Sequence, residues 1–256
     1  MADAERAGFA PEQTAKEIAP MFRYAALGLV SLVSSAALAQ QVPRLEGSAT
    51  PSASTGSTAP SKAAVSLAER RPGDHWTIEA RDEITGTVST QTAVVTEVTP
   101  TGVVSLRSNM VHPDNSHSES IQIYDQSWNQ IRSNRRQYFP YDASQGTLAP
   151  LAVGKTWTFQ FKSVDAGKFA RNYSGTSTVT GQETVTTKAG TFETFRIETT
   201  VSSNELKDPT RPTQVTRQSW YAPAIAHWVR LCTVVRIEGR LQSNQTSEIV
   251  EFGRQQ

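Results

Sequence analysis

The chain has 256 residues and a formal net charge of +1, with 37% hydrophobic and 19% charged residues. A charge balance so close to zero excludes the strongly basic surface of a nucleic-acid-binding protein, so we expect no nucleic acid among its partners. The length is sufficient for a hydrophobic core in one or two domains, and a single cysteine, Cys232, excludes an intramolecular disulfide.

The N-terminal region carries the pattern of a secretory signal peptide over residues 21–39. Met21 and Arg23 form a short basic start, an apolar stretch follows, and Ala-Leu-Ala precedes the expected cleavage site. The apolar stretch is too short to span a membrane, so we expect a periplasmic or secreted protein with no transmembrane segment after cleavage. Residues 1–20 carry acidic side chains that do not suit a signal peptide, and we interpret them as a non-native upstream extension.

The next segment, residues 40–64, consists mostly of Ser, Thr, Ala, Pro and Gly. Such a composition buries too little apolar surface to offset the entropy lost on ordering, so we predict a disordered linker. The remaining chain, residues 65–254, alternates apolar and polar side chains over many short stretches, which predicts a β-rich domain.

A Gly-x-x-Trp-Thr motif occurs twice in this domain, starting at Gly73 and at Gly154. Each copy continues into alternating apolar residues, the pattern of a strand with one face in the core and one in water. Trp76 and Trp157 fall on the apolar phase of these strands. We therefore predict that both indoles are core anchors and that the motif opens two similar β-units.

The predicted fold class is all-β: an antiparallel β-sandwich or a partly closed barrel built from two similar units, residues 65–145 and 146–254. Two separate small domains are the alternative. Hairpins are expected to turn at residues 100–102 and 189–190. A β-bulge is expected near Glu193, because the apolar alternation changes phase there.

The C-terminal part contains three segments with a recurring pattern: LAPLAVGKTWTF, VTGQETVTTKAGTFETFRIETT and WYAPAIAHWVR. Over about residues 150–252 the chain resembles a group of uncharacterised secreted bacterial β-rich proteins, labelled TapB-like. The chain departs from their pattern at residues 224–227, where they have a Gly-rich turn. The resemblance implies a curved antiparallel sheet or barrel and implies no activity. The matching positions are Pro150, Leu151, Gly154, Trp157, Gly181, Glu183, Val185, Ala189, Gly190, Thr191, Phe192, Trp220, Tyr221, Ala222 and Pro223.

Two groups of side chains are candidates for ligand binding. The first comprises four aromatic residues around a predicted turn, Trp220, Tyr221, His227 and Trp228. Such rings can stack on a sugar or close the mouth of a barrel, and the alternative is a hydrophobic corner that closes the sheet.

The second candidate group comprises Arg132, Arg135 and Arg136, next to Tyr138 and Phe139. Guanidinium groups beside aromatic rings can hold a phosphate or the anionic part of an envelope glycan or lipid. The alternative is a solvated edge strand, in which charge prevents edge-to-edge aggregation.

Catalytic and metal-binding signals are weak throughout. His112, Asp114, His117 and Glu119 have donor chemistry, but their spacing matches no metal-ligand pattern and is typical of a polar hairpin loop. We find no nucleophile elbow and no phosphate-binding glycine loop. We therefore predict no catalytic residues, no metal and no cofactor.

The sequence supports three functional hypotheses of different classes. The first is a non-enzymatic periplasmic or secreted domain that binds an apolar or amphipathic envelope ligand. The second is an interaction or structural component of envelope assembly or stress response, which docks through a sheet edge or the linker. The third is a hydrolase, which requires a pocket that joins His227 or His112 to a carboxylate. The candidate partners are a lipid, a glycan or an envelope protein, and the sequence leaves the oligomeric state open.

Overall fold

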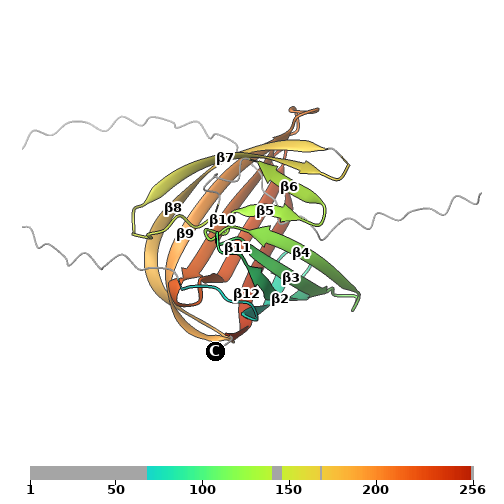
Figure 1. Cartoon of the computed structure of the whole chain (residues 1–256). Coiled ribbons are helices and arrows are strands. Elements are labelled where there is room, and N and C mark those ends of the chain that lie inside the picture. Colours follow the sequence, from blue (N-terminus) through green and yellow to red (C-terminus); the bar gives the residue numbers. More distant parts are fainter. Residues whose placement is uncertain (1–67, 140–145, 168, 255–256) are drawn as a thin grey trace, which may run out of the picture.

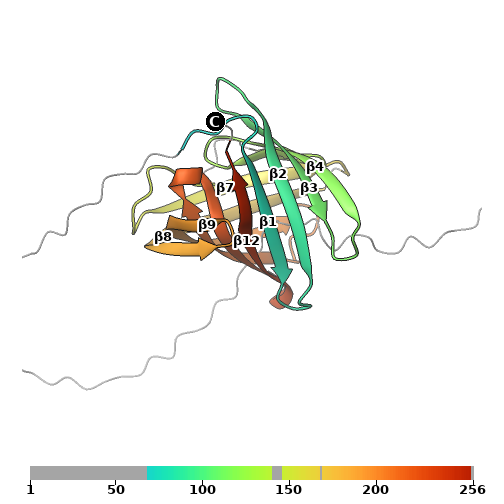
Figure 2. The same cartoon turned by 90° about the horizontal axis from the view of Figure 1, so that it is seen from below.

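The computed structural model describes residues 68–139, 146–167 and 169–254, so the predicted signal peptide, linker and upstream extension lie outside it. Within these ranges, twelve antiparallel strands follow one another around a closed barrel (Figure 1). The ring closes because β1 pairs with β2 on one side and with β12 on the other (Figure 2). The predicted all-β fold is confirmed in its barrel form. No helix in these ranges has the length and apolar character needed to cross a membrane.

The strands range from four residues in β5 and β6 to 18 residues in β8. The wall is shortest at β5 and β6, which pair with each other through one residue pair. The first six strands are β1 (His75–Asp82), β2 (Val88–Val98), β3 (Val104–Val111), β4 (His117–Tyr124), β5 (Gln130–Ser133) and β6 (Arg136–Phe139). The last six are β7 (Thr156–Asp165), β8 (Ala170–Thr187), β9 (Gly190–Glu205), β10 (Thr213–Ala222), β11 (His227–Ile237) and β12 (Arg240–Gly253).

The repeated Gly-x-x-Trp-Thr motif forms the same turn in both places. Gly73 and Gly154 have φ angles of 90° and 87°, a left-handed conformation that favours glycine. The N–H of Gly73 donates to the carbonyl of Val95, and the N–H of Gly154 donates to the carbonyl of Val179, both at 2.8 Å. The motif therefore marks one turn geometry that starts both β1 and β7.

The hydrophobic core follows the alternation of these two strands and their neighbours. Trp76 is fully buried and Trp157 is 7% exposed, which confirms that both indoles are core anchors. One apolar cluster lines the β7–β10 wall and includes Phe159, Phe161, Tyr173, Phe195, Ile197 and Val201. The other joins β1–β3, β11 and β12 and includes Val95, Val104, Leu106, Val229 and Ile249.

The β8–β9 hairpin extends beyond the neighbouring strands. It turns at Gly190, as predicted, but the irregular pairing lies between Val179 and Gly181 on β8. The bulge expected near Glu193 was therefore placed on the wrong strand of the pair. A bulge is located by the pairing of two strands, which the alternation of β9 alone does not show.

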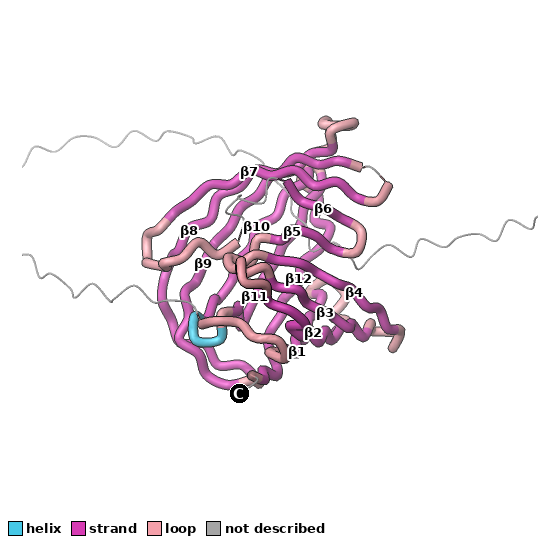
Figure 3. Tube along the Cα trace, viewed as in Figure 1, coloured by secondary structure: helices cyan, strands magenta, loops and turns pink. Residues whose placement is uncertain are grey.

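Beyond this bulge the hairpin covers one end of the barrel. Val185 is 4% exposed and packs in the same cluster as Trp76 and Ile249. The ammonium group of Lys188 lies 2.6 Å from the carboxylate of Glu79 on β1. The short 3₁₀ turn η1 (Pro223–Ile225) lies at the same end (Figure 3). We call this the closed end, and the opposite end of the strands the far end.

The approach of Phe159 to Gly175 gives a test of the packing. A Cβ on Gly175 would lie 2.4 Å from the Phe159 ring and 2.7 Å from the carbonyl of Thr200, whereas a Cβ on Gly181 meets nothing within 4 Å. We expect Gly175→Ala to lower the free energy of unfolding by about 1–3 kcal/mol. Gly181→Ala, the matched control, should change it by less than about 1 kcal/mol. Urea denaturation measures both, and equal effects would contradict the described wall.

Candidate functional site

The closed end is filled by aromatic rings around a buried arginine. The Trp76 ring stacks on His227 with centroids 4.8 Å apart, and Trp128 meets the same imidazole edge-on at 5.0 Å. The Arg70 guanidinium lies 4.2 Å from the centroid of the Trp128 ring and donates to the carbonyl of Ala226 at 3.3 Å. Each ring packs against protein, so this cluster functions as a plug of the barrel.

His227 is held neutral in the plug. Its Nδ1 donates to the carbonyl of Trp228 at 2.7 Å, and the ring is 6% exposed. Burial lowers the pKa of His227 from 6.5 to about 4, and the nearby charge of Arg70 acts in the same direction. The hydrogen bond to Trp228 opposes this shift but is the weaker effect.

Two of the four predicted aromatic residues lie inside the barrel and two lie partly outside. Tyr221 is 2% exposed and His227 is buried beside it at the closed end. Trp220 and Trp228 are half-buried, and the Trp220 indole donates to the carboxylate of Glu183 at 2.8 Å. The structure brings the four into one corner but not onto one face. This arrangement favours the interpretation as a hydrophobic corner over an exposed stacking platform.

The three predicted arginines lie at the far end and do not meet this corner. Arg132 and Arg135 are exposed, on β5 and in the β5–β6 turn. Arg136 is half-buried, and its charge acts on the neighbouring Tyr138, a ring that packs against the apolar cluster of the β7–β10 wall. Of these three arginines, only Arg136 lies on the strand face that points into the barrel, the face it shares with Tyr138.

The histidines of the polar hairpin also lie at the far end. The Nε2 of His112 lies 2.9 Å from the hydroxyl of Ser118, and Asp114 accepts hydrogen bonds from the backbone and hydroxyl of Ser116. In the part of the chain that is described, no group of three or more His, Cys, Asp or Glu side chains is placed to hold a metal ion. His112 and His227 are therefore at opposite ends of the strands.

The inner face of the barrel carries small polar side chains among its apolar ones. The strand pairing aligns a set of small polar residues with the buried Trp76, Trp157 and Tyr173, which places their side chains on the inward face. Each of these polar residues is 9% exposed or less. This set, which we call the polar interior, comprises Ser108, Ser163, Ser177, Thr199, Ser203, Thr233 and Ser247.

Several polar atoms of this inner face are buried without a hydrogen-bond partner. They are the hydroxyls of Ser108, Ser203 and Thr233 and the Nε of Arg217. Buried polar atoms in proteins are almost always paired, because an unpaired one costs about 1–3 kcal/mol. The interior is therefore chemically suited to contact a polar group.

Arg217 and Tyr124 are two polar side chains on the inward face of the barrel that are only half-buried. Side chains just fill the interior of a barrel of about eight strands, and a twelve-stranded wall is wider. The width of the ring is therefore compatible with space beside these two side chains.

Sequence reasoning missed Arg217, although a signal was present. On β10 the residues Val215, Arg217, Ser219 and Tyr221 share the inward phase, and Val215 and Tyr221 are each 2% exposed. An arginine between two core positions of a strand is rare without a charged partner, so this position marks a site.

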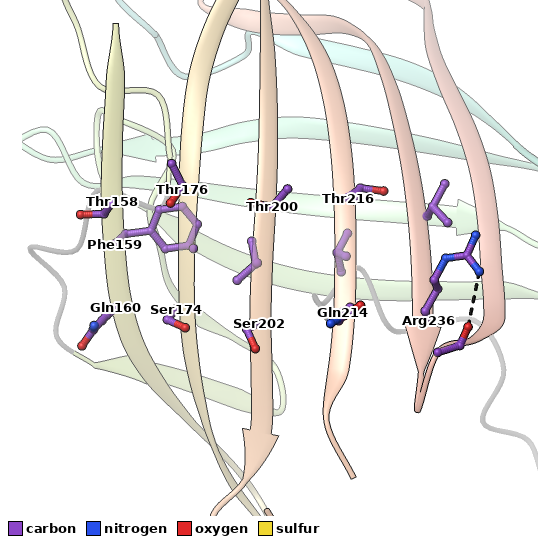
Figure 4. A pocket seen from close by; sticks show the side chains of 15 residues that line it. Thr158, Phe159, Gln160, Ser174, Thr176, Thr200, Ser202, Gln214, Thr216 and Arg236 are labelled. Carbon is purple, nitrogen blue, oxygen red and sulfur yellow. Dashed lines mark hydrogen bonds between the residues drawn. The ribbon is translucent and has the colours of Figure 1, made fainter. Parts of the chain in front are cut away.

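A hollow with a volume of about 780 Å³ lies on the outer face of β7–β11 (Figure 4). Its centre is a row of four threonines that face one another across adjacent strands, Thr158, Thr176, Thr200 and Thr216. Arg236 supplies a positive charge at one side. Cross-strand threonine pairs stabilise sheets, so this outer trough has a structural explanation.

Comparison with known proteins gives likeness of fold at low sequence identity. No family model and no curated protein matches the chain. A predicted lipoprotein from Parabacteroides distasonis aligns with a TM-score of 0.49 and 14% identity, over 75% of this chain and all of that one. A predicted exported protein with a YmcC-like fold from Bacteroides fragilis aligns with a TM-score of 0.48 and 14% identity, over 74% of this chain and 100% of that one. The hypothetical lipoprotein YmcC from Escherichia coli aligns with a TM-score of 0.41 and 13% identity, over 73% of this chain and 91% of that one.

The pKa of His227 predicts a pH dependence of stability. The unfolded imidazole takes up a proton near pH 6.5 and the folded one only near pH 4, so acid favours the unfolded state between these values. The contribution of His227 is complete above pH 6.5 and decreases as the pH falls toward 4, by about 3 kcal/mol in total.

Urea denaturation from pH 4 to pH 7 measures this effect. His227→Phe keeps a ring beside Trp76 and removes the titration, so its stability should fall less steeply in acid than that of the wild type. Parallel pH profiles for the two proteins would contradict the buried neutral imidazole. His117→Gln, at an exposed position, is the matched control and should follow the wild type.

Proposed function

We propose that this protein is a non-enzymatic binding module of the bacterial envelope, whose barrel interior holds an amphipathic ligand. The observation that carries the proposal is that Arg217 and Tyr124 lie on the inward face of the twelve-stranded barrel and are only half-buried. Ligand sites are concave and mostly apolar, with a few convergent polar groups, and this interior has that composition.

The walls of the interior differ in chemistry. Phe161 stacks on Tyr173 with ring centroids 4.4 Å apart. The ring centroids of Phe159 and Tyr138 lie 6.2 Å and 5.9 Å from that of Phe161. This aromatic wall suits an apolar group. The unpaired hydroxyls and Arg217 on the other inward positions suit a polar one. An amphipathic molecule satisfies both.

The sequence supports a location outside the cytoplasm. The signal-peptide pattern of residues 21–39 favours a periplasmic or secreted location, and the linker of residues 40–64 would tether the barrel. The resemblance to TapB-like proteins stays a prediction.

The two other hypotheses receive less support from the geometry. Neighbouring strands pair around the described barrel, but β5 pairs with β4 only at residues 122–124, and β6 pairs with β7 only at residues 162–165. Docking through a sheet edge therefore stays a prediction. The hydrolase hypothesis requires His227 to act as an acid or base. The positive charge of Arg70 lowers the pKa of His227 and so disfavours the imidazolium that a general acid requires. A docking function through the linker stays a prediction.

The neutral apolar probe N-phenyl-1-naphthylamine tests the proposal in solution. We expect saturable binding with increased fluorescence by the purified wild-type chain. Ser203→Leu places an apolar side chain in the interior and should weaken binding. Ser202→Leu, the adjacent residue on the outer face, lines the trough and should leave binding unchanged.

Thermal denaturation of both variants shows whether each is folded before binding is compared. Loss of binding in Ser202→Leu but not in Ser203→Leu would place the site in the outer trough and overturn the proposal. Absence of binding by the wild type would also overturn it. Native mass spectrometry of protein purified gently from periplasm should show a bound molecule that organic extraction removes.

A further inference from the structure

We propose that Arg217 is the binding site for one anionic group, a carboxylate or phosphate, on the ligand of the barrel interior. This inference rests on the proposed function and names the chemistry of the polar part of that ligand. It requires that Arg217 lie inside the barrel, lack a charged partner and have other donors nearby.

Its position inside the barrel follows from the strand register. Arg217 pairs with Thr199 on β9 and with Thr233 on β11, and both threonines are buried on the inward face. Val215 and Tyr221, two and four residues away on the same face, belong to the interior at 2% exposure each. The guanidinium therefore projects from the middle of the β10 wall into the barrel.

Within the described barrel, Arg217 has no acidic partner, unlike Arg171 and Arg230. Arg171, also on an inward phase, donates to Glu205 at 3.2 Å and to Thr213 at 3.1 Å, and Arg230 meets Glu248 at 2.5 Å. Across the described residues, none of the ion pairs includes Arg217, and its Nε has no hydrogen-bond partner.

Tyr124 is the ionisable group that acts on Arg217, and it does not neutralise the guanidinium. Burial raises the pKa of the Tyr124 phenol, so the hydroxyl stays protonated at neutral pH. The same hydroxyl donates to Gln122 at 2.8 Å. A guanidinium does not lose its proton under these conditions, so the positive charge remains uncompensated within the protein.

The surroundings of Arg217 supply a second donor. Thr233, directly opposite on β11, has a buried hydroxyl without a partner. A guanidinium and a hydroxyl together match the oxygen atoms of a carboxylate or phosphate, and hydrogen bonds between charged groups are about twice as strong as neutral ones. An unpaired buried cation destabilises a fold, and such a residue is expected at a functional position.

Matched twelve-carbon amphiphiles test the inference. We expect the wild type to bind dodecanoate at least roughly tenfold more tightly than dodecanol, measured by displacement of N-phenyl-1-naphthylamine. Arg217→Gln should remove this preference. Arg217→Lys should retain part of it. Arg236→Gln removes the charge that lines the outer trough and should bind as the wild type does.

Stability supplies an independent readout. Without ligand, Arg217→Met should unfold at a higher temperature than the wild type, because it replaces an unpaired buried cation by an apolar side chain of similar length. A lower unfolding temperature would contradict the unpaired state. If Arg217→Gln does not fold, Thr233→Val tests the same position without a change of charge, and dodecanoate should then bind more weakly than to the wild type.

The outcomes separate the two proposals. Equal affinity of the wild type for dodecanoate and dodecanol would leave the proposed function standing and overturn the role of Arg217. A preference for dodecanoate that persists in Arg217→Gln would do the same. Binding of inorganic phosphate alone, lost in Arg217→Gln, would support the anion site and overturn the amphipathic ligand. No binding of any of the three would overturn both.

Discussion

The pairing of β1 with β12 is the constraint on which the rest of the structure depends. Eight residue pairs join the two ends of the strand order and convert a twelve-stranded sheet into a ring. Once the ring is closed, the alternation of side chains separates an inside from an outside, and every inward residue shares one interior. Trp76 on β1 is 0% exposed, because β12 and β2 flank it and the rings of Trp128 and His227 pack against it.

Both ends of the described interior contain buried polar atoms without a partner. At the closed end, Arg70, Trp76, Trp128 and His227 pack through stacking and cation–π contacts, although the Nε of Arg70 and the indole nitrogen of Trp76 are unpaired. Farther along, some hydroxyls of the polar interior and the Nε of Arg217 are also unpaired. Evolution retains such costs where a protein contacts something else, so the position at which local packing rules fail is the natural place for a site.

The closed barrel also shapes how the protein presents itself outside. Ladder pairs connect all neighbouring strands of the described barrel, and the weakest connection is the single residue pair between β5 and β6. The outer face of β7–β11 carries a row of threonines and small polar side chains, which favours contact with water. In the proposed function the interior carries the recognition chemistry, while the row of threonines on the outside has a structural explanation.

The sequence by itself determined the local structure: strands from alternation, both hairpin turns, and the burial of Trp76 and Trp157. The repeated Gly-x-x-Trp-Thr motif predicted the start of two strands, and the structure adds that a left-handed glycine precedes each of them. Only the tertiary structure decided that the predicted Arg132 and Arg135 lie exposed at the far end and that Arg217 faces the interior unpaired. Alternation assigns a residue to one of two faces, but which face is enclosed, and what lies opposite, depends on ring closure between strands far apart in the chain.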